Sequence, residues 1–405
     1  MRSLLLALLL VGCRHTDRAP DPPAVAAPAT RRAPPHPDAG AHAAGEHAFY
    51  ASTFERQPTV QEMTALGERV FRDRGLSASG TLACASCHDP DNAYAPADAR
   101  AVELGGRDGK LAGARTPPSL RYLQAVPRFT EHFSDPDVDD GADQGPAGGL
   151  TWDGRAQSTH DQARSPLYSP LEMANASPEE LAARLRRAPY APELRAAFGP
   201  HALESATSAQ KAVTLVLEVY QQDRVKFYPY TSKFDAVLRG EARLTEREAR
   251  GFALFNDPAK GNCASCHPSA VKDGFPAFTD FGYVALGVPR NPVIPANADP
   301  GYFDLGLCGP YRTDLAAHPE YCGRFRTPSL RNVARRRRFM HNGVFTSLRQ
   351  VLEFYAARTE RFDDLPARYR QNVTAEAPFG ARRRLSPAEI ADLIAFLETL
   401  SDVDA

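Results

Sequence analysis

The sequence predicts a mainly α-helical protein made of two related domains in tandem. The pentapeptide Cys-Ala-Ser-Cys-His occurs twice, at residues 84–88 and 263–267. A similar apolar segment precedes each copy, at residues 67–71 and 251–255, and each half ends on a segment with helical periodicity. Strand-like alternation is scarce, and a chain of 405 residues suits two or three domains.

Further matched segments support the internal repeat. Residues 115–121 are similar to residues 326–331, and residues 152–154 (Trp-Asp-Gly) are similar to residues 341–343 (His-Asn-Gly). Each half then closes on a predicted helix with apolar residues at helical spacing. These apolar residues are Val213, Leu215, Val216, Leu217 and Tyr220 in the first half, and Ile390, Leu393, Ile394, Leu397 and Leu400 in the second.

Both pentapeptides have the C-x-x-C-H pattern that attaches c-type haem. The two thiols form thioethers to the haem vinyl groups, and the adjacent histidine binds the iron. A zinc site and a redox C-x-x-C are the alternatives, but zinc needs a second ligand pair and a redox motif needs no histidine. We therefore expect two covalently bound haem c groups. The attachment residues are Cys84, Cys87 and His88, and Cys263, Cys266 and His267.

A haem motif between an entry helix and a closing helix is the layout of a small cytochrome c. We therefore expect two tandem cytochrome c-like domains, at residues 49–235 and 236–405, each with one haem. Ser386 and Glu389 form a capping box, which predicts the start of the last helix.

The first residues indicate export. Residues 1–13 resemble a bacterial lipoprotein signal peptide, in which a short apolar run precedes Cys13 at the position that is acylated. A plain signal peptide with an unrelated cysteine is the alternative. Residues 14–48 are rich in Ala and Pro and have almost no large apolar side chain, so we expect a disordered tether. These features predict a periplasmic protein anchored by lipid to a bacterial membrane.

The two remaining cysteines are Cys308 and Cys322. In an oxidising compartment two such thiols are expected to form a disulfide. Two unpaired buried thiols are the alternative.

Composition bounds the partners of the protein. Hydrophobic residues at 43% and charged residues at 24% are close to the globular average, so the chain can bury ordinary cores. A formal net charge of -1 gives no global basic field. Nucleic acid is therefore not an expected partner.

Together these residues resemble the bacterial di-haem cytochrome c peroxidases, and in particular their MauG-like branch. The resemblance covers nearly all of residues 49–402, and residues 151–173 are its most specific stretch. In that stretch the family places a tryptophan between the haems, and a glutamine, a proline and a glutamate on the distal side of the N-terminal haem. The matching residues are Trp152, Gln162, Pro166 and Glu172.

Peroxide reduction calls for these types of side chain. A carboxyl such as Glu172 can carry a proton from one peroxide oxygen to the other. Gln162 can donate or accept hydrogen bonds without charge. Trp152 is the only tryptophan of the chain, and an oxidisable ring between two haems suits an electron relay. Taken singly, a core tryptophan, a loop glutamine and a solvated glutamate are the ordinary alternatives.

The N-terminal haem departs from many family members, which hold a histidine on this iron. Residues 89–131 contain neither His nor Met, and His132 is the first candidate after them. We therefore expect an open iron, with His88 as its protein ligand.

The C-terminal haem, bound by His267, is expected to differ from that of many family members in its second iron ligand. Tyr355 follows His341 by fourteen residues, as the tyrosine of MauG-like proteins does, where other members use methionine. A phenolate favours high iron oxidation states. The alternative is a core tyrosine with Met340 or His341 on the iron. The inward face of the predicted helix consists of Leu348, Val351, Leu352 and Tyr355.

The resemblance also implies calcium between the haems, bound by an Asn side chain and backbone carbonyls. Thr116 stands where the Asn is expected, and the arginine run at residues 335–338 replaces a Thr-x-Pro stretch. Both substitutions weaken the expectation of calcium. The arginine run could pair with haem propionates or with an acidic donor, although a solvated basic face is the commoner meaning of such a run.

The resemblance implies a peroxidase that reduces hydrogen peroxide to water. Peroxide would be activated at the N-terminal haem, and electrons would enter through the C-terminal haem from a small cytochrome c or cupredoxin. A MauG-like oxidase that modifies another protein is one alternative, although a chain with no tryptophan besides Trp152 lacks a relay of surface tryptophans. A plain electron-transfer cytochrome is the other, but it would not need Gln162 and Glu172 beside an open iron.

Overall fold

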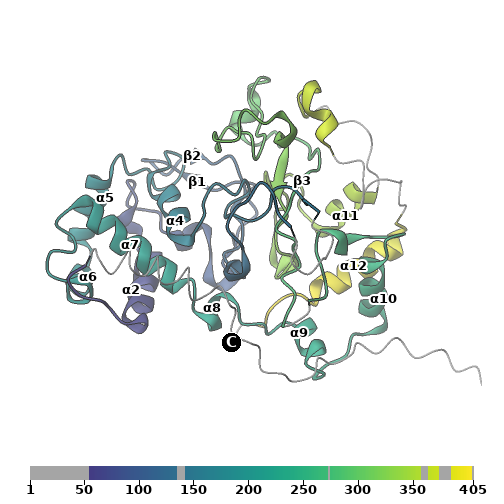
Figure 1. Ribbon diagram of the computed structural model, residues 1–405, viewed down its shortest axis with the longest axis horizontal. Coiled ribbons are helices and arrows are strands. Elements are labelled where there is room, and N and C mark those ends of the chain that lie inside the picture. The colour runs from purple at the N-terminus through teal and green to yellow at the C-terminus, as the bar shows by residue number, and fades with distance from the viewer. Residues whose placement is uncertain (1–53, 135–141, 272–273, 357–363, 374–384, 404–405) are drawn as a thin grey trace, which may run out of the picture.

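The computed structural model describes residues 54–134, 142–271, 274–356, 364–373 and 385–403. It is mainly helical, as predicted, and the described β structure consists of two short antiparallel pairs (Figure 1). The strands are β1 (Leu104–Gly105) with β2 (Leu111–Ala112), and β3 (Tyr283–Ala285) with β4 (Arg324–Arg326). The helices are α2 (Val60–Arg72), α3 (Cys84–Cys87), α4 (Thr159–Tyr168), α5 (Pro178–Arg187), α6 (Ala191–Phe198), α7 (Ala206–Tyr220), α8 (Arg224–Phe227), α9 (Lys233–Leu238), α10 (Glu246–Asn256), α11 (Leu348–Ala356) and α12 (Pro387–Glu398).

Local sequence explains where the main helices begin. At α12 the Ser386 side chain accepts a hydrogen bond from the Glu389 backbone, and the Glu389 side chain accepts one from the Ser386 backbone. This is the predicted capping box, and it satisfies two backbone donors that a helix start leaves unpaired. Equivalent boxes at Thr59 and Thr245 begin α2 and α10, the entry helices of the two halves.

The described residues contain two large hydrophobic clusters, one in each half of the sequence. The first contains buried residues from Leu66 to Phe227, and the second contains buried residues from Phe234 to Leu400. In Figure 1 the helices of the first cluster lie on the left and those of the second on the right. Within each cluster the entry helix packs along the closing helix, α2 on α7 and α10 on α12.

A glycine permits close helix contact at the same place in each half. A Cβ on Gly67 of α2 would lie 2.1 Å from the Val216 carbonyl oxygen of α7. A Cβ on Gly251 of α10 would lie 2.0 Å from the Asp392 carbonyl oxygen of α12. The same requirement therefore explains both glycines at the start of the matched apolar segments. It is the close backbone contact between the entry helix and the closing helix.

The two halves are joined by buried polar contacts near the C-terminus. Asp402 is 3% exposed. Its carboxylate accepts hydrogen bonds from Tyr122 Oη at 2.7 Å, Arg121 Nη1 at 3.1 Å and Asn332 Nδ2 at 2.7 Å. Arg121 and Tyr122 belong to the first half, and Asn332 and Asp402 belong to the second. The chain end therefore ties both halves together.

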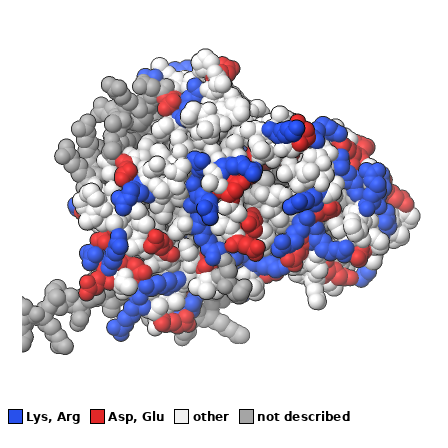
Figure 2. Space-filling model, turned by 180° about the vertical axis from the view of Figure 1, so that it is seen from behind, with Lys and Arg blue, Asp and Glu red and all other residues white. Residues whose placement is uncertain are grey.

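The predicted signal peptide, the acylated Cys13 and the tether at residues 14–48 lie outside the described residues. None of the helices in the described part of the chain is long and apolar enough to span a membrane. On the face shown in Figure 2, basic and acidic side chains are interspersed rather than gathered into one large patch of a single sign.

The close contact at Gly67 predicts that alanine destabilises the protein at this position, opposite to its usual effect in a helix. Alanine normally favours a helix interior over glycine by up to about 1 kcal/mol. Gly67→Ala should nevertheless lower the free energy of unfolding by about 1–3 kcal/mol, because the added methyl group would overpack the contact with α7. Urea unfolding of the haem-loaded protein measures this change. Ala65→Gly, on the exposed side of the same helix, is the matched control for propensity alone. A more stable Gly67→Ala protein would contradict the proposed contact.

Candidate functional site

The first Cys-Ala-Ser-Cys-His segment forms α3 and opens into a cavity. Cys84, Cys87 and His88 line this first cavity, whose empty space, including the part open to solvent, is about 1990 Å³. The Nδ1 atom of His88 lies 3.2 Å from the Tyr94 carbonyl oxygen. A carbonyl partner fixes the ring as Nδ1–H, which leaves the Nε2 lone pair for a ligand in the cavity.

The second Cys-Ala-Ser-Cys-His segment repeats this arrangement. Cys263, Cys266 and His267 line a second cavity of about 1970 Å³, again including the part open to solvent. The Nδ1 atom of His267 lies 2.8 Å from the Phe278 carbonyl oxygen. Both halves therefore present two thiols and one imidazole nitrogen to a large cavity.

These two cavities fit haem better than the alternatives. The four cysteines form no disulfide, and burial raises the pKa of the Cys84 and Cys263 thiols to about 12. Redox cysteines have lowered pKa values instead. Within the described ranges, no group of three or more His, Cys, Asp or Glu side chains could hold a metal ion. The zinc alternative therefore has no ligand set in this part of the chain.

Helix α4 carries two of the predicted side chains into the first cavity. Ser158 caps the helix by accepting a hydrogen bond from the Asp161 backbone. Gln162 and Pro166, one turn apart, both line the cavity. Pro166 lies inside the helix and has no N–H to donate to the Gln162 carbonyl. Helix α4 therefore lacks one backbone hydrogen bond in the turn that borders the cavity.

Glu172 is positioned by the β1–β2 hairpin. The Gly106 N–H donates to the Glu172 carbonyl oxygen at 2.8 Å, and a Cβ on Gly105 would lie 2.7 Å from the Glu172 Cα. The Glu172 side chain lines the cavity and is exposed to it. Desolvation by the surrounding protein raises the pKa of the carboxyl, and the Ser169 hydroxyl and Arg155 only partly oppose the shift.

Trp152 lies between the two cavities. It is 9% exposed and lines both of them. Its indole Nε1 donates to the Thr116 carbonyl oxygen at 2.7 Å, which fixes the ring orientation. The other residues that line both cavities are Pro118, Leu123 and Arg326.

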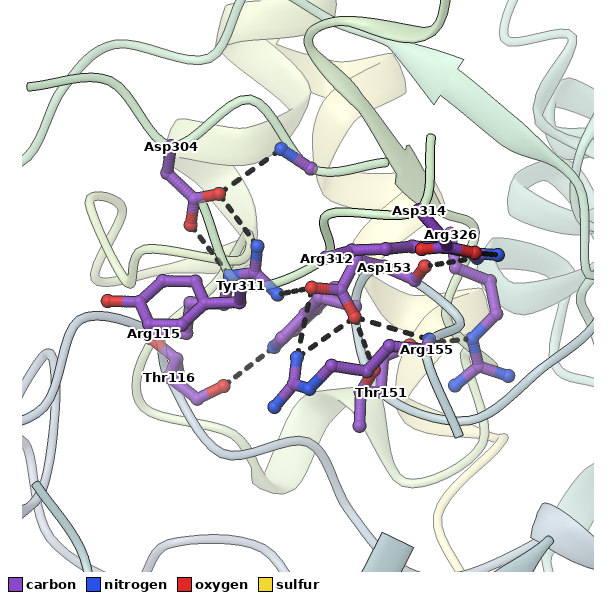
Figure 3. A network of polar contacts seen from close by, with 12 residues as sticks. Arg115, Thr116, Thr151, Asp153, Arg155, Asp304, Tyr311, Arg312, Asp314 and Arg326 are labelled. Atoms are coloured by element: carbon purple, nitrogen blue, oxygen red, sulfur yellow. Dashed lines mark hydrogen bonds and ion pairs between the residues drawn. The ribbon is translucent and has the colours of Figure 1, made fainter. Parts of the chain in front are cut away.

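A buried charge network holds the backbone next to Trp152 (Figure 3). The Asp153 side chain is fully buried, and it accepts hydrogen bonds from Arg115 Nη1 at 2.6 Å and from Arg155 Nη1 at 2.9 Å. Arg115 also donates to both oxygens of Asp304, at 2.6 and 2.7 Å. Burial alone would raise the pKa of Asp153, but Arg115 and Arg155 outweigh it and lower the pKa. The carboxylate is therefore a fixed negative charge.

The loop closed by the Cys308–Cys322 disulfide adds the outer part of this network. Arg312 donates to the Asp153 carbonyl oxygen at 3.0 Å. The Tyr311 ring lies 4.8 Å from the Arg115 guanidinium carbon and lines the first cavity. A loop of the second half thus completes the wall of the first cavity.

The second cavity contains all three side chains considered for its distal side. Tyr355 lines it from α11, and Met340 and His341 line it from the preceding segment. The His341 ring stacks on Phe325 with ring centroids 3.7 Å apart. The predicted inward face of α11 faces the same cavity in full, with Leu348, Val351, Leu352 and Tyr355.

The residues at the expected calcium position do not fit a cation site. The Thr116 hydroxyl donates to the Ala101 carbonyl oxygen at 2.6 Å, so it is engaged as a donor. Arg336 Nη2 donates to the Pro117 carbonyl oxygen at 3.1 Å, and Arg338 Nε donates to the Ala99 carbonyl oxygen at 2.6 Å. These two arginines contact the first half of the chain, so the arginine run is not simply a solvated basic face. Arg336 also lines the second cavity.

Sequence reasoning missed several residues of the first cavity. Glu103 lines it from the segment before β1, and Arg155 and Tyr311 line its outer part. Asp153 and Arg155 lie next to Trp152 in the sequence. The sequence does not show, however, that the Asp153 side chain is buried. His132, the candidate noted from sequence, is 78% exposed and pairs with Asp143, and it does not line the cavity.

The fold and the two cavities suit a protein with two haems, and the chain belongs to the di-haem cytochrome c peroxidase family. The family model for di-haem cytochrome c peroxidases matches residues 61–243. Methylamine utilization protein MauG of Paracoccus denitrificans (strain Pd 1222) is 36% identical over 378 residues, which are 87% of this chain and 92% of that protein. The chain is thus an oxidoreductase related to the cytochrome c peroxidases.

Solved structures agree with the family assignment. The di-haem peroxidase BthA from Burkholderia thailandensis E264 is similar with a TM-score of 0.76 and 39% sequence identity, over 87% of this chain and 88% of that one. A MauG-like protein associated with microbial copper homeostasis is similar with a TM-score of 0.62 and 27% identity, over 86% of this chain and 94% of that one.

The two cavities predict two haems that remain bound when the protein is unfolded, because thioether bonds survive acid-acetone extraction. Replacing Cys263 and Cys266 by Ala should remove one haem, and replacing Cys84 and Cys87 should remove the other. Pyridine haemochrome analysis per protein chain measures the stoichiometry. Fewer than two haems on the mature wild-type protein would refute the assignment.

Proposed function

We propose that this protein is a di-haem peroxidase that reduces hydrogen peroxide to water with electrons from a small redox protein. The observation that carries the proposal is the first cavity, where an imidazole, an amide and an enclosed carboxyl converge on one space. Bound there through Cys84, Cys87 and His88, haem would supply the iron at which peroxide is reduced. The remaining steps are assigned to side chains of the protein.

Glu172 is proposed to move the proton that peroxide cleavage requires. Its raised pKa keeps a larger fraction of the carboxyl protonated near neutral pH, so that it can donate as well as accept. Gln162 is proposed to support it with uncharged hydrogen bonds, and Pro166 is proposed to shape the wall beside it. All three line the cavity together.

The distal side of the first haem is proposed to be open. Besides His88, Met173 is the one His or Met among the described residues that line the first cavity, and its side chain belongs to the first hydrophobic cluster. His132 is turned toward Asp143 at the surface. This arrangement supports a resting iron that peroxide reaches without prior displacement of a protein ligand.

Trp152 is proposed to pass electrons from the second haem to the first. It is the single tryptophan of the chain, and it forms part of the wall of both cavities. Electrons are proposed to enter at the second haem, held by Cys263, Cys266 and His267, from a small cytochrome c or a cupredoxin.

Tyr355 is proposed as the distal ligand of the second haem. The internal repeat supports this role, because Tyr355 follows His341 by fourteen residues, as Pro166 follows Trp152. Tyr355 therefore occupies in α11 the position from which Pro166 lines the first cavity in α4. His341 is held by its stacking on Phe325.

The protein is proposed to act in the periplasm of a bacterium, attached to a membrane through acylated Cys13. This proposal depends on the apolar run and cysteine at residues 1–13. The tether at residues 14–48 would let the two haem domains, at residues 49–235 and 236–405, reach soluble partners.

A MauG-like oxidase that modifies another protein is the second candidate. Two observations favour it: the position of Tyr355 in the second cavity and the identity of 36% with a MauG protein. The first cavity would serve both functions, so the two candidates differ in the reductant and not in the peroxide chemistry.

Replacement of the carboxyl tests the peroxidase function. Glu172→Gln should slow peroxide turnover by roughly 10²- to 10⁴-fold, the loss typical of a general acid–base group, with both haem spectra little changed. Steady-state peroxide reduction with a reduced cytochrome c or cupredoxin measures it. Glu179→Gln, an exposed carboxyl of α5, is the control and should leave turnover unaffected. Unchanged turnover in Glu172→Gln would move the role to another group.

Replacement of the proposed ligand tests the second haem. Tyr355→Phe should shift the low-spin spectrum, because the phenolate oxygen is lost, while Met340→Leu should leave the ligation alone. Electron paramagnetic resonance and absorption spectra of the ferric protein measure both. If Met340→Leu removes the low-spin signal and Tyr355→Phe does not, the tyrosine assignment is wrong.

A further inference from the structure

Glu103 is a second acid in the wall of the first cavity. It lines that cavity together with Glu172, and its side chain is only 13% exposed. It comes directly before β1, and its carbonyl oxygen accepts a hydrogen bond from the Gly113 N–H at 2.8 Å. The backbone pairing of the hairpin therefore extends to Glu103 and fixes its place.

The strand geometry directs Glu103 toward the side where Glu172 lies. Side chains two residues apart on a strand point to the same face. A Cβ on Gly105 would point at the Leu171 carbonyl oxygen and the Glu172 Cα, at 2.1 and 2.7 Å. Glu103 lies two residues before Gly105 and lines the same cavity as Glu172, which Leu104 also borders. The hairpin thus carries one carboxyl and packs directly against the segment that carries the other.

Two charged side chains link Glu103 to the protein surface by ion pairs. Arg100 Nη1 lies 3.4 Å from Glu103 Oε2, and Arg100 Nε lies 3.2 Å from Asp98 Oδ2. The Arg100 and Asp98 side chains are 55% and 42% exposed. One end of this contact faces solvent and the other faces the cavity.

The charged surroundings of Glu103 come from three segments. Asp98 and Arg100 precede it in the chain, the Cys87 thiol belongs to α3, and Glu172 follows α4. The pKa of Cys87 is raised mainly by burial, and then by the negative charges of Glu103 and Glu172. Burial, followed by Asp98, raises the pKa of Glu103 to about 7, and Arg100 opposes the shift. Near neutral pH the carboxyl can therefore take up and release a proton.

We propose that Glu103 exchanges protons between solvent and the first cavity, and so resupplies the cavity in which Glu172 acts. Reduction of one peroxide to two waters consumes two protons and two electrons, and the electrons come from the protein donor. In the relay, the Glu103 O–H bond breaks as its proton passes into the cavity, and the carboxylate then takes a proton from solvent. The inference rests on the proposed peroxidase function.

An infrared pH titration tests proton exchange at Glu103 without any turnover. The full-length, haem-loaded ferric protein should show a carboxyl band that titrates near pH 7 and that Glu103→Gln lacks. Two exposed neighbours should move its midpoint in opposite directions. Arg100→Ala should raise the midpoint because it removes a positive charge, and Asp98→Asn should lower it because it removes a negative charge. The matched control is Arg107→Ala, in the turn of the same hairpin. This change breaks a surface ion pair with Glu180 of α5 and should leave the midpoint unchanged.

Turnover then tests the relay. Wild-type peroxide turnover should fall as pH rises through 7, because the acid form of Glu103 is depleted. Glu103→Gln should lower turnover at pH 6 by about tenfold, less than the roughly 10²- to 10⁴-fold loss expected for Glu172→Gln. It should also remove the decline around pH 7.

The outcomes separate the two proposals. Absence of the band, or midpoint shifts of the wrong sign, would overturn proton exchange at Glu103. A titrating band together with unchanged turnover and pH profile in Glu103→Gln would overturn its role in the relay. A wild-type protein that reduces no peroxide would instead overturn the peroxidase function, while the infrared titration still decides whether Glu103 exchanges protons with solvent.

Discussion

The geometry of the site depends on the ion pairs of the buried Asp153 carboxylate. A charge removed from water is costly unless other charges and hydrogen bonds compensate it. Arg115 and Arg155 supply that compensation, and Arg115 carries the contact on to Asp304 in the second half. Asp153 directly follows Trp152, so the same network that satisfies the carboxylate also holds the indole between the two cavities. Loss of Arg115 or Arg155 would leave the buried carboxylate less compensated and would weaken the support of the backbone next to Trp152.

The two halves use one backbone plan with different side chains. Gly154 and Gly343 occupy matched positions with φ of +65° and +64°, and matched bridges join Leu150 to Ala156 and Phe339 to Phe345. The helices α4 and α11 then begin at matched places. What differs is the chemistry that they present, an amide and a proline in the first cavity and a tyrosine in the second. One backbone plan thus carries an acid-lined first cavity and a second cavity that contains a tyrosine.

Much of this arrangement could be predicted from sequence, because the signals are local. The spacing within Cys-Ala-Ser-Cys-His, the capping box at Ser386 and the i, i+3, i+4, i+7 pattern that ends at Tyr355 each lie within a few turns of chain. Glu103 could not be recognised in the same way. It is an ordinary acid in a loop, and its significance comes from the packing of Gly105 against Glu172, which are 67 positions apart in the chain.

The sequence by itself determined the family, the two Cys-Ala-Ser-Cys-His motifs, the helical character and the residue types of the first cavity, because such motifs and helical periodicity lie within short stretches of chain. Only the tertiary structure decided that Trp152 borders both cavities, that Arg336 and Arg338 donate to carbonyl oxygens of the first half, and that the disulfide loop completes the wall beside Arg115. These features depend on long-range burial. Burial sets which charges must pair and which acids hold their protons, and no short segment specifies it.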